Sequence, residues 1–257
     1  MKALISIGNN REITVDLDQP ICISIPIKEG AQNPNCYWAE PVKFETIKAD
    51  GFIGSVKEGG SVNYQKLQIT PHGNGTHVEG LGHITDLGAT INKQLTTYHF
   101  YSKLISLAPT KTLKGDFKIE LTQEIEDLEL KDIKALIIRT LPNSTAKLTK
   151  NYSGNNPPFI DSKLIEFLVE QEIEHLLIDL PSVDKEVDNG ALLSHRAFWN
   201  LQKKNREHCT ITELIFVPDN IPDANYLLNL QTINLEMDAA PCNPTLYKIE
   251  ESIIISR

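Results

Sequence analysis

The sequence predicts an α/β protein built around a mixed or barrel-like β-sheet. Three observations support this prediction. The first sixty residues contain short strand-like segments separated by turns, and the second half alternates short apolar runs with amphipathic segments. In addition, 40% of the 257 residues are hydrophobic, which is enough to fill a core. We find no linker, internal repeat or low-complexity segment, so we expect residues 1–257 to form a single domain.

Strand-like segments dominate the N-terminal part. Residues 11–19 (REITVDLDQ) and 22–27 (CISIPI) alternate apolar with polar side chains or carry β-branched ones, as half-buried strands do. Residues 29–41 (EGAQNPNCYWAEP) are predicted to form a loop because they are rich in Gly, Pro and Asn. Residues 63–70 (NYQKLQIT) predict another strand, which leads directly into a group of histidines.

The second half predicts alternating strands and helices. Within the charged stretch 101–132, KIELTQEIEDLEL is compatible with a strand followed by a helix or a turn. The predicted strands are 133–140 (IKALIIRT), 175–180 (HLLIDL) and 212–217 (TELIFV). The first two are apolar enough to be buried on both faces. The predicted helices are 161–175, with Asp161 as the N-cap, and 195–205. This alternation favours some parallel strand pairing.

Composition and charge argue against several classes of function. The net charge is −9 and no basic block is present, so we expect no binding to nucleic acid or to an anionic membrane. The N-terminal residues lack the apolar run of a signal peptide, and no stretch is long enough to span a bilayer. Cys22, Cys36, Cys209 and Cys242 lack metal-finger spacing and are compatible with reduced thiols or with one disulfide. We therefore expect a cytoplasmic protein that acts on a small molecule.

Residues 72–83 (HGNGTHVEGLGH) contain three of the seven histidines, four glycines and Glu79. Imidazole nitrogens and a carboxylate suit zinc, manganese or iron(II), and no cysteine is close in sequence. In an extended segment, His77 and Glu79 point to the same side and can reach one ion. The glycines permit tight turns and positive φ angles that would turn the side chains inward. The chain lacks the Gly-Lys-Ser/Thr element of a phosphate loop and the G-x-S-x-G element of a serine hydrolase.

A hydrolytic metal site needs further donors from elsewhere in the chain. The candidates lie at strand ends or at a helix start in the second half: Asp179, Asp184, His195 and Glu213. Glu213 stands in an apolar strand, where a carboxylate without a partner is costly. It is either a metal ligand or an edge-strand residue that faces water. The remaining histidines, expected to be surface or hydrogen-bonded side chains, are His99, His175 and His208.

These stretches resemble the metal-dependent cyclase family, which includes the bacterial kynurenine formamidases. The family signature His-x-Gly-Thr-His-x-Asp-x-Pro-x-His is similar to residues 72–83. A strand ending in Asp-x-x-Ser-Val-Asp is similar to IDLPSVD (178–184), which His195-Arg196 follows, and a strand beginning Glu-Asn-Leu is similar to TELIF (212–216). The order agrees from about residue 69 to 217. The family's early Trp-containing substrate loop weakly resembles CYWAEP (36–41).

The resemblance implies a swivelling β/β/α, cyclase-like fold with flanking helices, assembled as a homodimer or homotetramer. It also implies one or two divalent ions, zinc or manganese. The implied metal ligands are His72 and His77 for one ion, His195 for a second, and Glu79 and Glu213 as bridging carboxylates. His83 is the implied catalytic proton donor and acceptor. Trp38 would shape the substrate pocket, unless it is a plain core aromatic.

The chain also departs from the family signature. One extra residue precedes the Gly-Thr-His element, Glu replaces Asp at position 79, Leu replaces Pro at position 81, and extra residues separate His195 from Glu213. The longer carboxylate of Glu79 moves its oxygens by about 1.5 Å, roughly one bond length. The number and the identity of the ions are therefore open.

We expect a formamidase-like enzyme of the kind found in tryptophan catabolism. It would hydrolyse an amide-type bond, with a metal-activated water attacking the carbonyl and His83 shuttling a proton. Two alternatives remain. One is a hydrolase of cyclic amide, imide or ester substrates from the same family. The other is a non-catalytic protein whose metal braces the fold.

Overall fold

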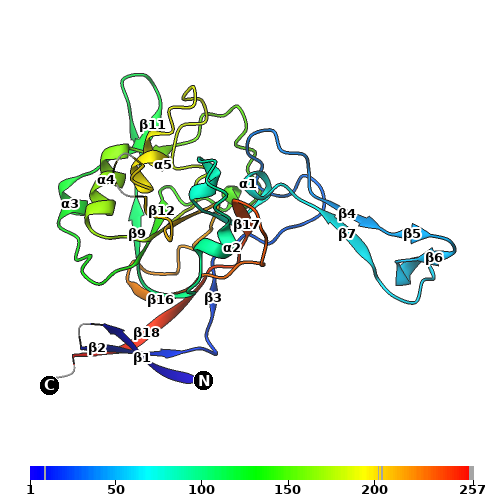
Figure 1. Ribbon diagram of the computed structural model, residues 1–257, viewed down its shortest axis with the longest axis horizontal. Coiled ribbons are helices and arrows are strands. Elements are labelled where there is room, and N and C mark those ends of the chain that lie inside the picture. The colour runs from blue at the N-terminus through cyan, green and yellow to red at the C-terminus, as the bar shows by residue number, and fades with distance from the viewer. Residues whose placement is uncertain (9, 202, 204, 255–257) are drawn as a thin grey trace.

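A mixed β-sheet forms the centre of the molecule, with short helices packed around it (Figure 1). The computed structural model describes residues 1–8, 10–201, 203 and 205–254. The strands of this sheet are β1 (Lys2–Gly8), β2 (Arg11–Asp16), β3 (Ile21–Cys22), β8 (His77–Glu79), β9 (His99–Leu107), β12 (Ala135–Thr140), β14 (His175–Ile178), β15 (Thr210–Glu213), β16 (Asn225–Asn229), β17 (Ala239–Pro241) and β18 (Thr245–Ile254). Their order is β1-β2-β18-β16-β9-β12-β14-β15-β8-β17, with β3 paired to β18. The predicted α/β fold with a mixed sheet is confirmed.

The middle of the sheet is parallel and buried on both faces. Strands β9, β12, β14 and β15 pair in parallel, whereas β8, β16 and β17 pair antiparallel to their neighbours. Successive residues of β12 alternate between two apolar clusters: Leu136 and Ile138 join one, Ala135 and Ile137 the other. This double burial explains the uninterrupted apolar runs from which β12 and β14 were predicted.

Short helices flank the sheet. The α-helices are α1 (Pro71–Asn74), α2 (Ile91–Gln94), α3 (Gln123–Glu126), α4 (Ser162–Glu170) and α5 (Leu193–Phe198), and the 3-10 helices are η1 (Val56–Glu58), η2 (Leu81–His83) and η3 (Thr145–Thr149). Helix α4 begins where predicted, because the Asp161 side chain accepts a hydrogen bond from the Lys163 amide. It ends earlier than predicted, before Glu172, whose φ of 59° interrupts the helix. Helix α5 is also shorter than predicted.

Several strand predictions are wrong at their boundaries. Strand β15 begins at Thr210 and stops at Glu213, because Leu214 adopts a φ of 54°. Glu213 therefore lies at the end of a strand and not inside one. Residues 22–27 contribute only the end of β3 and an isolated bridge between Ser24 and Ile215. No strand was predicted for β9 or for the three C-terminal strands, although β9 lies near the middle of the sheet.

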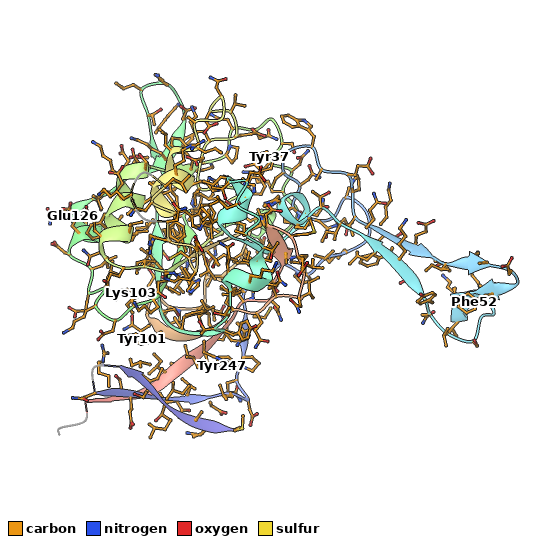
Figure 2. The ribbon with its side chains drawn as sticks, viewed as in Figure 1. Tyr37, Phe52, Tyr101, Lys103, Glu126 and Tyr247 are labelled. Atoms are coloured by element: carbon orange, nitrogen blue, oxygen red, sulfur yellow. The ribbon has the colours of Figure 1, made fainter. Side chains whose placement is uncertain are left out.

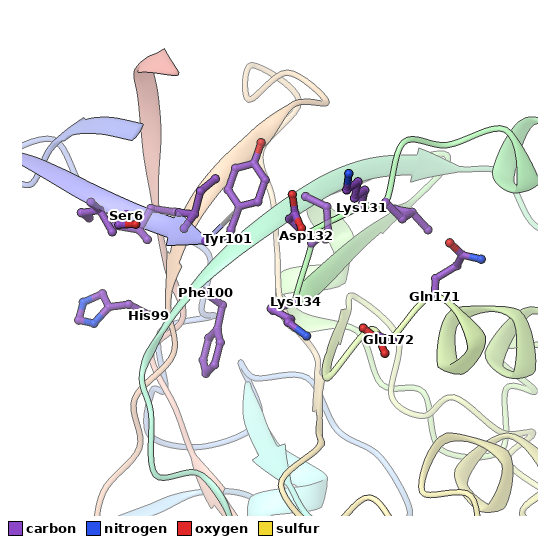
Figure 3. A pocket seen from close by; sticks show the side chains of 15 residues that line it. Ser6, His99, Phe100, Tyr101, Lys131, Asp132, Lys134, Gln171 and Glu172 are labelled. Carbon is purple, nitrogen blue, oxygen red and sulfur yellow. The ribbon is translucent and has the colours of Figure 1, made fainter. Parts of the chain in front are cut away.

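Smaller elements lie at the periphery. They are β4 (Lys43–Thr46), β5 (Lys48–Ala49), β6 (Phe52–Ile53), β7 (Gln65–Gln68), β10 (Thr110–Lys111), β11 (Phe117–Ile119) and β13 (Phe159–Ile160). Strands β4 to β7 form an arm that projects from the body (Figure 1), with Phe52 at its outer end (Figure 2). A hollow of about 670 Å³ lies between strand β1 and the start of β9. Tyr101 and Lys134 are among its lining residues (Figure 3). Among the described residues, no helix has the length and apolar character needed to cross a membrane.

Candidate metal centre

Strand β8 carries two of the predicted ligands on one face. His77 and Glu79 are two residues apart and fully buried, while Val78 between them joins an apolar cluster on the other side. Strand β15 pairs with β8 in a register that sets Glu213 opposite His77. The His77 Nε2 atom lies 3.5 Å from Glu213 Oε2. Sheet pairing therefore brings residues from two distant parts of the sequence into one buried group.

Three further histidines surround Glu79. His72 on α1 places Nδ1 3.2 Å from Glu79 Oε2, and His83 on η2 places Nε2 3.6 Å from the same oxygen. His195 on α5 places Nε2 3.0 Å from the other oxygen, Oε1. The two carboxylate oxygens of Glu79 thus face different imidazoles. All six residues expected at the centre, namely the four of the histidine stretch together with His195 and Glu213, lie close to one another.

The glycines of this stretch serve a different purpose from the one predicted. The four glycines between His72 and His83 all lie in the described part of the chain, and none of them has a φ angle in the left-handed region. The prediction of positive φ angles at these glycines is therefore wrong. Space is the reason for three of them. A Cβ atom would lie 2.3 Å from the Cβ of Ala39 at Gly73 and 1.9 Å from the carbonyl oxygen of Ala89 at Gly82. At Gly80 it would lie 1.9 Å from Gln94 Oε1. These glycines let neighbouring segments pack closely around the histidines.

In each of the four imidazoles, one ring nitrogen faces a glutamate of the centre and the other bonds to an acceptor outside it. The acceptors are Asp238 Oδ2 for His72 Nε2 (2.9 Å) and His83 Nδ1 (3.3 Å), the Gly75 carbonyl oxygen for His77 Nδ1 (2.9 Å), and Asp184 Oδ2 for His195 Nδ1 (2.6 Å). The remaining nitrogen of each ring faces Glu79 or Glu213. Metal-binding histidines in proteins show this same pattern, in which an outer acceptor sets the tautomer and the ring orientation.

The two aspartates of the segment 178–184 have separate roles. Asp184 accepts from His195 and also from the backbone amides of Ser194 and His195 at the start of α5. Asp179 is turned away and pairs with Lys147 at 2.7 Å. Neither is among the residues whose ligand atoms converge. Asp238 was missed by sequence reasoning, because it is a single aspartate in a loop with no motif around it.

The donor atoms fit a divalent cation. Two buried polar atoms of the centre, His77 Nε2 and Glu79 Oε2, have no hydrogen bond of acceptable geometry, which is rare for buried polar atoms unless something else binds them. Three overlapping sets have ligand atoms within 4.8 Å of one another: His72, His77 and Glu79; His72, His83 and Asp238; and Glu79, His83 and His195. Imidazole nitrogens and carboxylate oxygens without thiolates suit zinc or manganese.

The carboxylates and imidazoles of the centre shift one another's pKa values. Burial opposes ionisation of Glu79, but the imidazoles of His83 and His195 outweigh it and hold its pKa well below the usual value. Burial and then the charge of Glu79 raise the pKa of Glu213. Burial also disfavours the imidazolium of His195, yet Asp184 and Glu79 raise its pKa to about 10. Unless a cation binds, a proton on the His195 imidazole therefore offsets the negative charge of the Glu79 carboxylate.

One side of the centre is open. The side chains of His72, His83 and Asp238 are 26%, 30% and 34% exposed, whereas those of Glu79 and His195 are 1% and 2% exposed. Solvent therefore reaches the centre from the side that His72, His83 and Asp238 form.

Trp38 lies outside this group. It is 70% exposed, which rules out the alternative of a core aromatic, and its backbone amide donates to Ser153 Oγ. Its place in a substrate pocket stays a prediction. The neighbouring Tyr37 is 43% exposed as a whole residue, but its phenol group lies near Ser182, where desolvation followed by the charge of Glu213 raises its pKa. Tyr37 is thus the aromatic of this loop that lies nearer the centre.

The other histidines are hydrogen-bonded or at the surface, as expected. His175 is buried on β14, with Nδ1 2.8 Å from Thr210 Oγ1. His99 is exposed and bonds to Asn229, and His208 is exposed. They take no part in the centre.

Comparisons with known proteins identify the family of this chain. A family described as "Putative cyclase" matches residues 15–185. A kynurenine formamidase of Bacillus cereus is 26% identical over 197 residues, which cover 76% of this chain and 85% of that protein. The kynurenine formamidase of Bacillus anthracis is 25% identical over 229 residues, or 88% of this chain and 97% of that protein.

Solved structures share the fold. One, described as a potential metal-dependent hydrolase with cyclase activity, superposes with a TM-score of 0.64 at 19% identity, covering 91% of this chain and 99% of that one. An isatin hydrolase bound to the product analogue thioisatinate also gives a TM-score of 0.64, at 12% identity, covering 90% of this chain and 93% of that one.

Proposed function

Because this chain belongs to the cyclase family, we propose that it is a metal-dependent hydrolase that cleaves an amide-type bond. The observation that carries the proposal is the convergence of four imidazoles and two glutamates, with Glu79 at the middle. The relatives named kynurenine formamidase support an N-formylated aromatic amine as the class of substrate.

The proposed ligands are His72, His77, Glu79, His195 and Glu213, which would hold one or two zinc or manganese ions. A bridging role for Glu79 is supported by the two directions in which its oxygens point. Oε1 lies 3.0 Å from His195 Nε2, and Oε2 lies 3.2 Å from His72 Nδ1. The longer side chain of glutamate can reach both sides where the family signature has aspartate.

The chemistry divides between the cation and the chain. When bound, a divalent cation supplies a Lewis acid that polarises a carbonyl and acidifies water. His83 then acts as the proton carrier: its Nε2 takes a proton from the attacking water and returns it to the leaving nitrogen. Asp238 holds Nδ1 of the same ring, so that Nε2 stays directed toward Glu79. The buried residues His77 and His195 close the far side, and substrate reaches the centre past His83.

The open side favours an enzyme over a protein whose metal only braces the fold. Structural zinc sites are closed by protein ligands, whereas catalytic sites keep a position accessible to water and substrate. Here the side chains of His72 and His83 remain about a quarter to a third exposed while the opposite ligands are buried.

The test combines metal analysis with a substrate panel. The purified protein is analysed for bound metal by mass spectrometry and then assayed on formylated anilines, cyclic imides and lactones. We expect bound zinc or manganese and turnover of the formylated anilines. Preference for the cyclic imides or the lactones would replace the proposed substrate class, and metal without turnover of any panel member would favour the bracing role.

Replacing His83 with Ala tests the mechanism. Turnover should fall by about 10²- to 10⁴-fold while the metal content is unchanged, because a proton carrier is lost and a ligand is not. His99→Ala is the matched control, since His99 is exposed and bonds only to Asn229 among the contacts described, and it should keep full activity. Loss of metal from His83→Ala would make His83 a ligand and overturn its assigned role.

A further inference from the structure

We propose that Asp238 is a positioning residue that sets the orientation of both imidazoles on the open side of the centre. The inference rests on the proposed function, because it concerns how His72 binds a metal and how His83 carries a proton. Asp238 lies directly before β17, far along the chain from the histidine stretch.

One oxygen of Asp238 serves two rings. Oδ2 lies 2.9 Å from His72 Nε2 and 3.3 Å from His83 Nδ1, and the two rings lie 4.3 Å apart at an angle of 31°. In each ring the opposite nitrogen faces Glu79 Oε2. Because Asp238 accepts from the outer nitrogens, it selects the Nε2–H tautomer of His72 and the Nδ1–H tautomer of His83. The inner nitrogens are then free to bind a cation or to take up a proton.

The carboxylate is placed by the strand that pairs with the one carrying Glu79. Strand β17 pairs with β8 in a register that sets Ala239 opposite Glu79, and the Gly80 amide donates to the Asp238 carbonyl oxygen at 3.0 Å. The backbone of Asp238 is therefore tied to the segment that carries Glu79. Its distance from the centre depends on sheet pairing and not on a flexible loop.

Asp184 provides a useful comparison on the closed side. Asp184 accepts a hydrogen bond from His195 Nδ1 at 2.6 Å, while His195 Nε2 lies 3.0 Å from Glu79. The His195 ring is thus held between an outer aspartate and Glu79, as the rings of His72 and His83 are. Asp184 serves a single ring, however, and its other contacts are backbone amides. Asp238 serves a proposed ligand and the proposed proton carrier together, so its loss should affect metal affinity and the His83 tautomer at once.

The experiment compares Asp238→Ala and Asp238→Asn with Glu236→Gln, a control on the same loop whose side chain is 74% exposed. Zinc affinity is measured by competition with a chromophoric chelator, and imidazole tautomers are measured by ¹⁵N NMR of the zinc-loaded proteins. We expect Asp238→Ala to weaken zinc binding by about 10- to 100-fold and to convert His83 from the Nδ1–H form to a mixture of tautomers. Asp238→Asn retains an acceptor oxygen and should recover part of both properties, and Glu236→Gln should match the unchanged protein.

Each contrary result has a distinct meaning. If the unchanged protein binds no zinc, the proposed function fails, and this inference fails with it. If it binds zinc and both Asp238 variants keep the same affinity and the same imidazole spectra, the inference is overturned while the proposed function stands. If Asp238→Ala loses one equivalent of zinc but keeps the His83 tautomer, Asp238 is itself a ligand and the positioning role is wrong.

Discussion

A buried histidine away from the metal centre should make the stability of this protein sensitive to acid. His175 is 3% exposed on the central strand β14, and its ring lies 2.8 Å from Thr210 Oγ1 and 4.0 Å from the ring of Phe100. Burial, followed by the positive charges of His208 and Arg206, lowers the pKa of His175 to about 3. The folded protein therefore keeps this imidazole neutral far into the acid range.

The sign and the size follow from proton linkage. An unfolded chain restores the ordinary pKa of about 6.5, so between about pH 6.5 and pH 3 the unfolded state binds a proton that the folded state does not. The free energy of unfolding therefore falls as the pH falls through this window. At about pH 5 the loss from this one group is about 2 kcal/mol, against almost none at about pH 7.5. That loss is a large part of the stability of a typical domain, about 5–15 kcal/mol.

Urea unfolding of the chelator-treated protein at about pH 7.5 and about pH 5 measures this term. His175→Gln keeps a polar group near Thr210 but does not titrate. Between about pH 7.5 and about pH 5, its free energy of unfolding should therefore fall by about 2 kcal/mol less than that of the unchanged protein. Comparing the two pH values within each variant cancels the packing cost of the substitution. His99→Gln is the control, because His99 is exposed, and it should behave like the unchanged protein. An equal acid loss in His175→Gln and the unchanged protein would refute the reasoning.

Two further predictions concern the packing of a glycine near the centre and a buried ion pair away from it. Gly82→Ala should lower the free energy of unfolding by about 1–3 kcal/mol and reduce turnover. The added Cβ would lie 1.9 Å from the backbone oxygen of Ala89 and must displace η2. A variant with the unfolding free energy and the activity of the unchanged protein would contradict this. Lys147→Met should cost about 3–5 kcal/mol in urea unfolding, because it leaves the Asp179 carboxylate buried without its partner at 2.7 Å. Lys43→Met removes an exposed ion pair and should cost less than about 1 kcal/mol, so equal losses in the two lysine variants would show that burial of the pair is not the cause.

Local sequence determined the elements whose pattern leaves little choice. The uninterrupted apolar runs of β12 and β14 required burial on both faces, and that burial is available in the middle of a parallel sheet. Asp161 determined where α4 begins, because its side chain caps the first turn. Within the histidine stretch, a two-residue spacing on a strand was enough to place His77 and Glu79 on one face.

Tertiary structure decided which distant residues complete the centre. Asp238 has no motif of its own and takes its role only because β17 pairs with β8. The glycines near the histidines are required by the nearness of Ala39 and Ala89, not by their own backbone angles. Glu213 reaches His77 because β15 pairs with β8 in a register that sets Glu213, the last residue of β15, opposite His77. Pattern and propensity act over a few neighbouring residues, whereas register, close approach and burial depend on segments that meet only after folding.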